Sequence, residues 1–191
     1  MPRRYWFPKA YADWVARFRV PSGFLLVVTF ALFSQPDDHS LLMGVPVSLA
    51  GLALRAWASG HLLKDQRLAE TGPYAFTRNP LYLGTLLVAA GLVIDGRSMI
   101  LAIVFTLVFL FVYMPVIELE EQHLSEIFAE YEAYARRVPR LIGIPRGAPN
   151  AQYRFSIGGY RANREYQALL GFLLGLAFLV AKWLWFAPTA A

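Results

Sequence analysis

Polar residues that could bind an anion or a small zwitterion stand directly before an apolar run near the middle of the chain. The stretch Gly72–Gly84 reads GPYAFTRNPLYLG, and its Gly-Pro start favours a turn. Pro80 suits the first turn of a helix, where its missing N–H has no cost. Arg78 and Asn79 therefore precede a helix whose free N–H groups and positive dipole end favour an anionic ligand.

The side chains of this stretch add to that preference. The Arg78 guanidinium can donate two parallel hydrogen bonds to a carboxylate, and the Asn79 amide both donates and accepts. The same residue types also anchor ordinary helices at a membrane surface. The stretch alone leaves both interpretations open.

A second set of ionisable residues follows a long apolar segment. Glu118, Glu120 and Glu121 stand where Met99–Ile117 would leave a membrane. Carboxylates at that depth are costly unless they are solvated or paired with a cation. They could accept hydrogen bonds from ribose hydroxyls or ammonium groups, or pair with Arg78. They could equally begin a solvated amphipathic helix.

Cysteine and metal chemistry are not expected. The chain has no cysteine, which excludes disulfides, thiolate metal sites and cysteine nucleophiles. His39, His61 and His123 stand far apart without the spacing of metal ligands, so we predict no metal site. His61 follows an apolar segment, and the sequence does not decide whether it lines a pocket or lies at the membrane surface.

The elements that must position these residues are apolar enough to lie in a membrane. Of the 191 residues 57% are hydrophobic and 16% are charged, whereas a soluble domain carries about 25% charged residues. Mean hydropathy is +0.43. Five apolar segments approach the length of about 20 residues that a spanning helix needs. They are Val20–Phe33, Leu41–Gly60, Leu81–Ile94, Met99–Ile117 and Ala168–Phe186.

These segments predict an all-α fold, a polytopic membrane helix bundle with about five transmembrane helices. Residues 1–191 are expected to form a single integral-membrane domain. The tight turn Asp95–Ser98 should join the third and fourth segments into an antiparallel helical hairpin.

Positive residues predict how the chain crosses the membrane. Of the 18 Lys and Arg residues, five precede the first segment, four lie from Arg55 to Arg78 at and after the end of the second, and seven lie from Arg136 to Arg164. The positive-inside rule makes these regions cytoplasmic, so we expect the N-terminus inside and the C-terminus outside. The expected location is a bacterial or archaeal cytoplasmic membrane. Since topology accounts for the basic charge, nucleic-acid binding is not expected.

An amphipathic helix is predicted to cap the cytoplasmic side. From Glu118 the chain reads ELEEQHLSEIFAEYEAYARR, with apolar residues recurring every three or four positions. This period predicts a helix over Glu118–Arg137 that continues out of the fourth segment and folds over the cytoplasmic face. The following VPRLIGIPRGAPN is too rich in proline and glycine to remain helical.

Taken together, these motifs resemble a known family. GPYAFTRNPLYLG followed by EExxL and YxxYxxxVPR is similar to the integral-membrane S-adenosylmethionine-dependent methyltransferases. This group includes the isoprenylcysteine carboxyl methyltransferases and the phospholipid methyltransferases. The resemblance runs over about residues 60–140. It implies membrane helices capped by cytoplasmic segments, with S-adenosylmethionine enclosed between the two motifs.

The resemblance also implies roles for single residues. Cofactor contacts would come from Gln66, Arg67, Leu68, Ala69, Tyr74, Asn79, Pro80, Leu81, Tyr82 and Glu120. Arg78 and Glu121 would be the catalytic residues that support the pocket, and Glu121 would take a proton if the acceptor is an amine. The implied acceptor is a lipophilic small molecule that enters from the bilayer among the membrane lipids and carries a carboxylate or an amine.

Three positions depart from the family pattern. Asn79 stands where the prenylcysteine enzymes have histidine. Phe128 and Ala129 stand for the family's Phe-Gly, with one residue fewer before Tyr131, which predicts a straighter cytoplasmic helix. Val116 stands where the prenylcysteine enzymes have an arginine that binds the substrate carboxylate, so prenylcysteine is not the substrate we expect.

Two other functions fit parts of the sequence. Membrane sterol and isoprenoid reductases, which bind NADPH, have a similar arginine–tyrosine motif and acidic helix. A non-catalytic membrane scaffold would bind anionic lipid through the basic cluster Arg136–Arg164, at about 1 kcal/mol per basic residue. A scaffold gives no reason for the two motifs. A reductase usually needs additional basic residues and many more spans than 191 residues provide, so a methyltransferase is the function we predict.

A C-terminal transmembrane helix over residues 167–187 lies outside the resemblance. Gly171 and Gly175 have the GxxxG spacing that permits close helix packing. We expect this packing within the bundle, and no oligomeric state is predicted from it.

Overall fold

The structure, a computed structural model, describes residues 6–64, 66–144 and 154–186. These residues form helices and connecting loops with no β-strand among them, which confirms the predicted all-α class. The helices in chain order are α1 (Lys9–Ala16), α2 (Arg19–Phe33), α3 (Asp38–Ser59), η1 (Gly72–Ala75), α4 (Pro80–Gly96), α5 (Met99–Val108), η2 (Phe109–Tyr113), α6 (Met114–Ile127), α7 (Tyr131–Arg137), α8 (Ile157–Ala162) and α9 (Tyr166–Phe186).

Three helical runs are long and apolar enough to cross a membrane. They are α3, α9 and the continuous run Met99–Ile127 that α5, η2 and α6 form together. The pair α1 and α2 also reaches this length, with a bend of 58° between them. The 17-residue α4 is apolar but shorter. The predicted number of five spans is therefore approximate.

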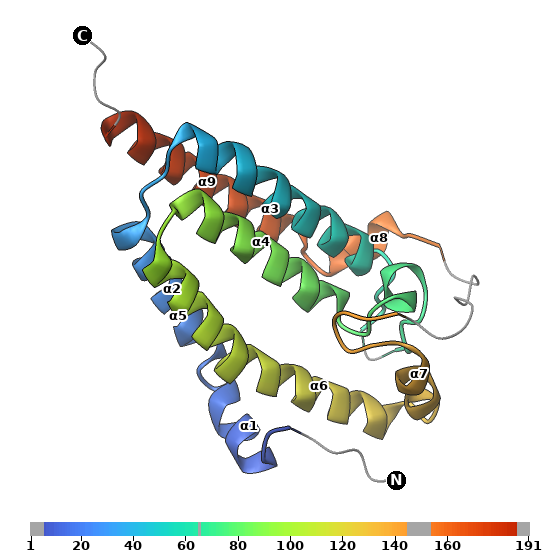
Figure 1. Cartoon of the computed structure of the whole chain (residues 1–191). Coiled ribbons are helices and arrows are strands. Elements are labelled where there is room, and N and C mark those ends of the chain that lie inside the picture. The colour runs from blue at the N-terminus through green and yellow to red at the C-terminus, as the bar shows by residue number, and fades with distance from the viewer. Residues whose placement is uncertain (1–5, 65, 145–153, 187–191) are drawn as a thin grey trace.

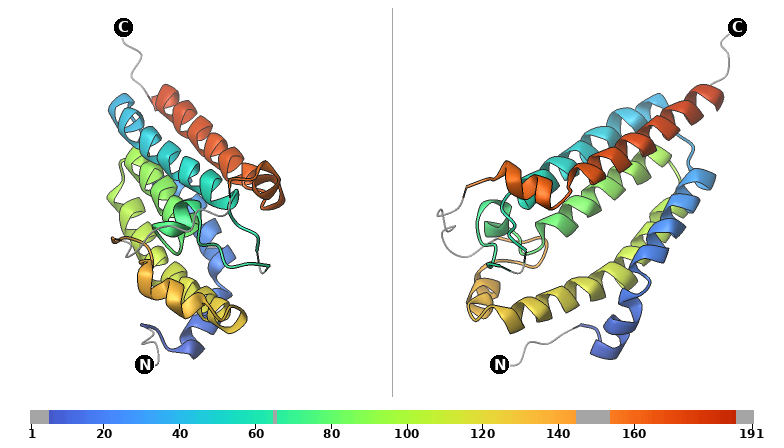
Figure 2. Two further views of the ribbon diagram at one scale, coloured as in Figure 1. Left: turned by 90° about the vertical axis from the view of Figure 1, so that its right-hand side faces the viewer. Right: turned by 180° about the vertical axis from the view of Figure 1, so that it is seen from behind.

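The long helices form two arms that meet at one end and diverge toward the other (Figures 1 and 2). One arm contains α3, α4 and α9, and the other contains α2 and the α5–α6 run with α1 beside it. The Asp95–Ser98 turn joins the arms, and in it Arg97 adopts the left-handed conformation and pairs with Asp37. The predicted hairpin of α4 and α5 is thus an open V.

The first arm is held together by close packing of α3 on α4. A Cβ on Gly51 would lie 2.6 Å from the Gly84 carbonyl oxygen, and one on Gly91 would lie 2.2 Å from Ser48 Oγ. Ser48 Oγ also donates a hydrogen bond to the Val88 carbonyl at 3.1 Å. Lipid offers no hydrophobic force between helices, so such small residues and interhelical hydrogen bonds stabilise the pair.

The glycine pair of α9 does not pack in this way. No atom lies within 4 Å of a Cβ built on Gly171, and the nearest atom to one on Gly175 is 3.9 Å away. The close helix approach predicted for these glycines is therefore not made within the described bundle. It occurs instead between α3 and α4.

The predicted cytoplasmic helix over Glu118–Arg137 is broken, so the expectation of a straighter helix is wrong. α6 ends at Ile127, and Phe128 after it is extended, with φ −121° and ψ 111°. The break lets Tyr131 and Tyr134 of α7 pack into a small apolar core under the loop that precedes α4. Burial of these two tyrosines, 1% and 2% exposed, is the physical gain that favours the bend.

The chain begins and ends on opposite sides of this arrangement. α1 lies at the open end of the V, whereas the C-terminal end of α9 lies at the joined end (Figure 1). The predicted topology, with the N-terminus inside and the C-terminus outside, requires such an arrangement. Which end faces the cytoplasm stays a prediction.

Candidate functional site

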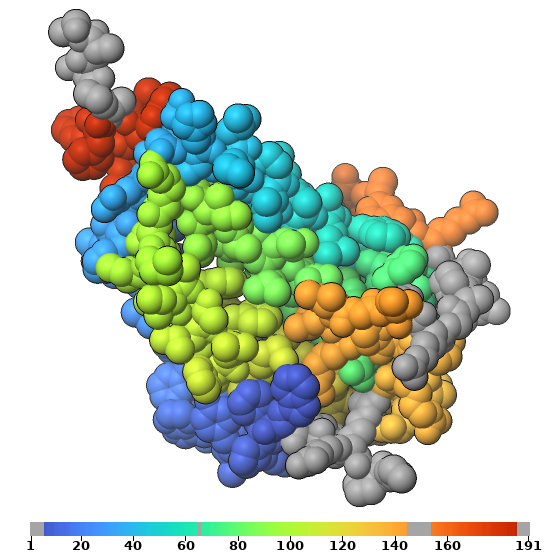
Figure 3. Space-filling model, viewed as in Figure 1, coloured from blue at the N-terminus to red at the C-terminus, as the bar shows by residue number. Residues whose placement is uncertain are grey.

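A cavity of about 860 Å³ lies between the two arms at their open end. Figure 3 shows the surface hollowed between α4 and the α5–α6 run. The volume falls in the range of about 300–1,000 Å³ that is typical of small-molecule sites. Ten of the twelve predicted site residues line it: Arg67, Leu68, Ala69, Tyr74, Arg78, Asn79, Pro80, Leu81, Tyr82 and Glu120.

The other two predicted residues, Gln66 and Glu121, are not part of the cavity wall. Gln66 is exposed on the loop after α3, and its N–H donates to the Leu63 carbonyl. Glu121 is 1% exposed and lies behind the wall. His61 is also buried outside the wall, where its Nδ1 lies 3.0 Å from the Trp57 carbonyl oxygen.

Both oxygens of the Glu121 carboxylate are bound by other residues. Oε1 accepts from Asn79 Nδ2 at 3.1 Å and lies 3.3 Å from an Arg78 guanidinium nitrogen. Oε2 accepts from Arg140 Nε at 3.1 Å. A carboxylate held in this way is poorly placed to take a proton from a substrate, so the geometry does not support that predicted role. Glu121 instead joins α6 to the loop that precedes α4.

Arg140 is the central cation of this network, and no role was predicted for it from the sequence. It donates to Glu118 Oε1 at 2.8 Å as well as to Glu121, and its carbonyl accepts from Thr77 Oγ1 and Asn79 Nδ2, both at 3.1 Å. Burial lowers the Arg140 pKa, but Glu121 and Glu118 outweigh burial and the net pKa is raised. Its position at the end of the YxxYxxxVPR motif was the available signal.

The start of the described chain attaches to the same network. The backbone N–H groups of Trp6 and Phe7 donate to the Glu118 carboxylate at 3.0–3.2 Å. The Arg140 guanidinium lies 5.5 Å from the centre of the Trp6 ring. Because Glu118 is 1% exposed, these bonds replace the water that its carboxylate loses on burial.

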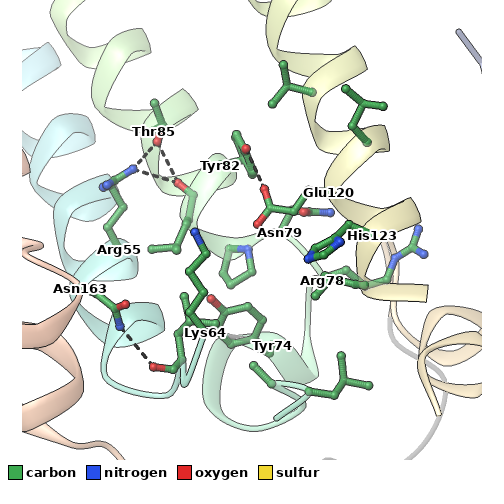
Figure 4. A pocket seen from close by; sticks show the side chains of 18 of the residues that line it. Arg55, Lys64, Tyr74, Arg78, Asn79, Tyr82, Thr85, Glu120, His123 and Asn163 are labelled. Atoms are coloured by element: carbon green, nitrogen blue, oxygen red, sulfur yellow. Dashed lines mark hydrogen bonds between the residues drawn. The ribbon is translucent and has the colours of Figure 1, made fainter. Parts of the chain in front are cut away.

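Tyr82 and Glu120 connect the two motifs across the cavity. They point toward one another from α4 and α6, and Tyr82 Oη donates to Glu120 Oε2 at 2.8 Å (Figure 4). Asn79 lines the same cavity, one helical turn before Tyr82. Two sequence segments about 40 residues apart therefore contribute to one site, as the resemblance implied.

Tyr74 also lies in the cavity wall, away from the Tyr82–Glu120 pair (Figure 4). Burial raises the pKa of its hydroxyl, and the Glu120 and Glu165 charges raise it further. Tyr134 Oη donates to the Tyr74 carbonyl at 2.8 Å, and burial also raises the Tyr134 pKa. Both phenols are therefore protonated at neutral pH.

An ion pair that was not predicted completes the wall. Arg55 of α3 donates to Glu165 Oε2 at 3.1 Å and to the Leu81 carbonyl at 3.3 Å. It also donates to the Thr85 hydroxyl (Figure 4). Glu165 precedes α9 and lies outside the region of resemblance. The signal was Arg55 itself, because an arginine inside an apolar segment needs a partner.

One donor in the wall has no hydrogen-bond partner among the described residues. Arg78 Nε is buried without an acceptor, although another nitrogen of the same guanidinium pairs with Glu121. A buried donor without a partner costs about 1–3 kcal/mol. A ligand carboxylate placed at the start of α4 would accept from it and would also face the positive end of the helix dipole.

Comparison with known proteins shows which families this chain is similar to. The model of the phospholipid methyltransferase family matches residues 43–131, from α3 to the start of α7. Protein-S-isoprenylcysteine O-methyltransferase of Schizosaccharomyces pombe is 27% identical over 143 residues, which cover 72% of this chain and 59% of that protein. These two matches support the predicted resemblance to the integral-membrane methyltransferases, which include the isoprenylcysteine and phospholipid enzymes.

Two other relatives have names that refer to metal resistance. Cobalt-zinc-cadmium resistance protein CzcN of Cupriavidus metallidurans is 33% identical over 144 residues, which cover 69% of this chain and 66% of that protein. Nickel-cobalt-cadmium resistance protein NccN of Alcaligenes xylosoxydans xylosoxydans is 29% identical over 187 residues, covering 87% and 84%. The chain thus spans less than two thirds of the length of two of these three relatives.

Two further observations concern solved structures and metal sites. No solved structure matches the chain significantly. Within the part of the chain that the structure describes, no group of three or more His, Cys, Asp or Glu side chains is arranged to hold a metal ion.

Proposed function

We propose that this protein transfers a methyl group from S-adenosylmethionine to the polar end of a lipophilic acceptor, a carboxylate or an amine of a lipid or isoprenoid. One observation carries the proposal. Asn79 and Tyr82 of the first motif and Glu120 of the second line the same cavity, and Tyr82 and Glu120 are hydrogen-bonded to each other. The match to a methyltransferase family model supports this function, and the apolar helices support a location in the membrane.

The chemistry of the wall fits S-adenosylmethionine. Its amino-acid carboxylate would accept from Arg78 Nε, which is buried without a partner among the described residues. Its ribose hydroxyls or ammonium group would donate to the Glu120 carboxylate. Its adenine would pack against the aromatic and apolar side chains of Tyr74 and Leu68 in the same wall.

Methyl transfer depends on positioning more than on proton transfer. When bound, the sulfonium supplies an electrophilic methyl group, and the acceptor must approach it in line at about 3–3.5 Å. In this protein the Tyr82–Glu120 hydrogen bond fixes the two arms relative to each other at the cavity. The Asn79–Glu121–Arg140 network holds the loop before α4 in place. The apolar wall excludes water that would compete with the acceptor.

Binding of S-adenosylmethionine to the purified protein in detergent tests this function by isothermal titration calorimetry. We expect Tyr82→Phe and Glu120→Gln each to weaken binding by about tenfold, because each removes a hydrogen-bonding group at the cavity. Tyr166→Phe and Glu126→Gln are matched controls at exposed positions outside the wall, and both should bind as the native protein does.

Two outcomes would contradict the proposal. One is a native protein that binds no S-adenosylmethionine, and the other is unchanged affinity in both wall variants. A thermal-shift measurement with NADPH and S-adenosylmethionine offered separately covers the reductase alternative. Stabilisation by NADPH alone would replace the methyltransferase with that alternative.

A further inference from the structure

Arg19 is a cation in the cavity wall that neither family motif accounts for. It is the first residue of α2, directly after the 58° bend between α1 and α2. Its guanidinium carbon lies 5.8 Å from the centre of the Tyr82 ring, and Val116 lies in the same wall. Among the described residues no carboxylate forms an ion pair with Arg19.

The surrounding helices hold Arg19 at this place. α1 is attached to the α5–α6 run through Tyr11 Oη, which donates to the Phe111 carbonyl at 2.8 Å. Ser22 Oγ donates to the Arg19 carbonyl at 3.0 Å and tightens the first turn of α2. An arginine at the end of a spanning helix ordinarily extends to the membrane surface. Here the Arg19 side chain is exposed and also lies over the Tyr82 ring, next to the Tyr82–Glu120 hydrogen bond.

Two other arginines of the wall are paired, Arg55 with Glu165 and Arg78 with Glu121. Glu120 accepts a hydrogen bond from Tyr82, the ring on which Arg19 lies. Arg19 differs from these two arginines because no described carboxylate balances its charge, and it lies beside Tyr82 and near Val116 in the wall. A guanidinium in this position matches a carboxylate with two parallel hydrogen bonds and repels an ammonium group.

We infer that Arg19 binds the carboxylate of the methyl acceptor, so that the acceptor is a lipophilic carboxylic acid and not an amine. The inference rests on the proposed methyltransferase function and adds the residue that selects the substrate. Val116 cannot bind a carboxylate, and Arg19 reaches the same wall from a different helix.

A carboxylate acceptor also agrees with the state of the acidic residues. A carboxylate oxygen forms a bond to the methyl carbon while the carbon–sulfur bond breaks and its electron pair goes to sulfur. An anion and a sulfonium thus become a neutral ester and a neutral thioether, and no proton moves. An ammonium acceptor would first have to lose a proton. Of the two carboxylates in the wall, Glu165 is held in an ion pair with Arg55 and Glu120 already accepts a hydrogen bond from Tyr82.

The first experiment identifies the bond that is formed. Purified protein is incubated with S-adenosylmethionine labelled in the methyl group and with a bacterial lipid extract, and the labelled lipid is treated with mild alkali. A methyl ester releases volatile methanol, whereas an N-methyl group stays in the lipid. We expect volatile label. Label that resists alkali would overturn the inference while leaving the methyltransferase function intact.

The second experiment assigns the selection to Arg19. Arg19→Gln should lower kcat/KM for the lipid acceptor by about 10- to 100-fold, the range expected for loss of a hydrogen-bonded ionic contact. Its affinity for S-adenosylmethionine should stay within twofold of the native value. Arg19→Lys should be intermediate, because it keeps the charge and loses the paired donors. Arg17→Gln, exposed at the same bend, should behave as the native protein.

A binding measurement without cofactor separates substrate selection from turnover. Oleate, oleamide and oleylamine share one chain, and their affinities for the protein in dodecylmaltoside are compared by microscale thermophoresis. Oleate should bind most tightly to the native protein, and this preference should disappear in Arg19→Gln. If the native protein and Arg19→Gln had the same preference for oleate, the inference would be overturned. Failure of the native protein to bind S-adenosylmethionine would instead overturn the proposed function.

Discussion

Arg140 balances two buried carboxylates at once. Glu118 and Glu121 are each 1% exposed, and the Arg140 guanidinium lies 2.8–3.1 Å from both. Arg78, Asn79 and the first described backbone N–H groups supply the remaining hydrogen bonds. Such a cluster is stable only while every charge has a partner, because each buried ion has lost its hydration.

Removing Arg140 should therefore be strongly destabilising. We expect Arg140→Gln to lower the free energy of unfolding by about 3–5 kcal/mol, the usual effect of leaving a buried charge uncompensated. Thermal unfolding in detergent measures this. Arg137→Gln is the matched control, because its ion pair with Glu70 is exposed and should contribute at most about 1 kcal/mol. Equal losses in both variants would show that the buried network is not the stabilising feature.

Single residues could be predicted where a motif fixes their spacing along the chain. Asn79, Tyr82 and Glu120 all line the cavity as expected. The partners of Arg55 and the role of Arg140 could not be predicted, because an ion pair between residues 110 or 22 positions apart leaves no local pattern. The folded structure brings such partners together. From the sequence, the cost of burying an unpaired charge indicates only that some partner must exist.

At the scale of helices, α3 and α4 pack so closely that their contact leaves no space for larger side chains at its glycines. The close approach of their backbones places the start of α4, and with it the first motif, beside the end of α3. Such packing was expected at Gly171 and Gly175, which have the GxxxG spacing. On α3 and α4 the close contacts instead involve Gly51 and Gly84, on two different helices.

A side chain in this interface should separate the two helices. A Cβ at Gly91 would lie 2.2 Å from Ser48 Oγ and 2.5 Å from the Gly44 carbonyl oxygen, so Gly91→Val should cost about 1–3 kcal/mol of stability or more. Thermal unfolding of the two purified variants is the measurement. Gly171→Val is the control, since nothing lies within 4 Å of its Cβ. If Gly171→Val were as unstable as Gly91→Val, the close packing of α3 on α4 would not be the cause of the instability.

The helices themselves were largely predictable, and their irregularities were not. The apolar segment Leu41–Gly60 corresponds to α3 at Asp38–Ser59, and Leu81–Ile94 to α4 at Pro80–Gly96. Hydrophobic length and Pro80 sufficed for this. The break at Phe128 had no such signal, because the pattern of apolar residues every three or four positions continues through it. Packing of the α7 tyrosines decides the bend, and that packing exists only in the folded protein.

On the scale of the whole molecule, the two arms create the cavity by diverging. A short turn predicts that α4 and α5 run in opposite directions, but it does not set the angle between them. That angle follows from which face of α4 carries glycines, since this face packs on α3 and leaves the other arm free to diverge. The V shape was therefore not predictable from segment lengths and loop charges.

The direction in which the arms cross the membrane can be tested directly, because the native chain has no cysteine. With the predicted topology, Asp38→Cys should react with a membrane-impermeant maleimide added to intact cells. Arg136→Cys should react only after permeabilisation. Both positions are exposed, and the unmodified chain is the blank. The opposite labelling pattern would place the N-terminus outside and move the cavity to the other side of the membrane.

The bond between Arg55 and Glu165 has a consequence for chain length across the family. The family match ends at residue 131, so the counter-ion of an arginine within a spanning helix comes from a segment that the common domain does not include. A relative without this segment would leave that guanidinium with only the Thr85 hydroxyl and the Leu81 carbonyl as partners and no counter-ion. Proteins of this kind that stop earlier are therefore expected to have an uncharged residue at the position of Arg55. Gain of the last helix and gain of this arginine should have occurred together.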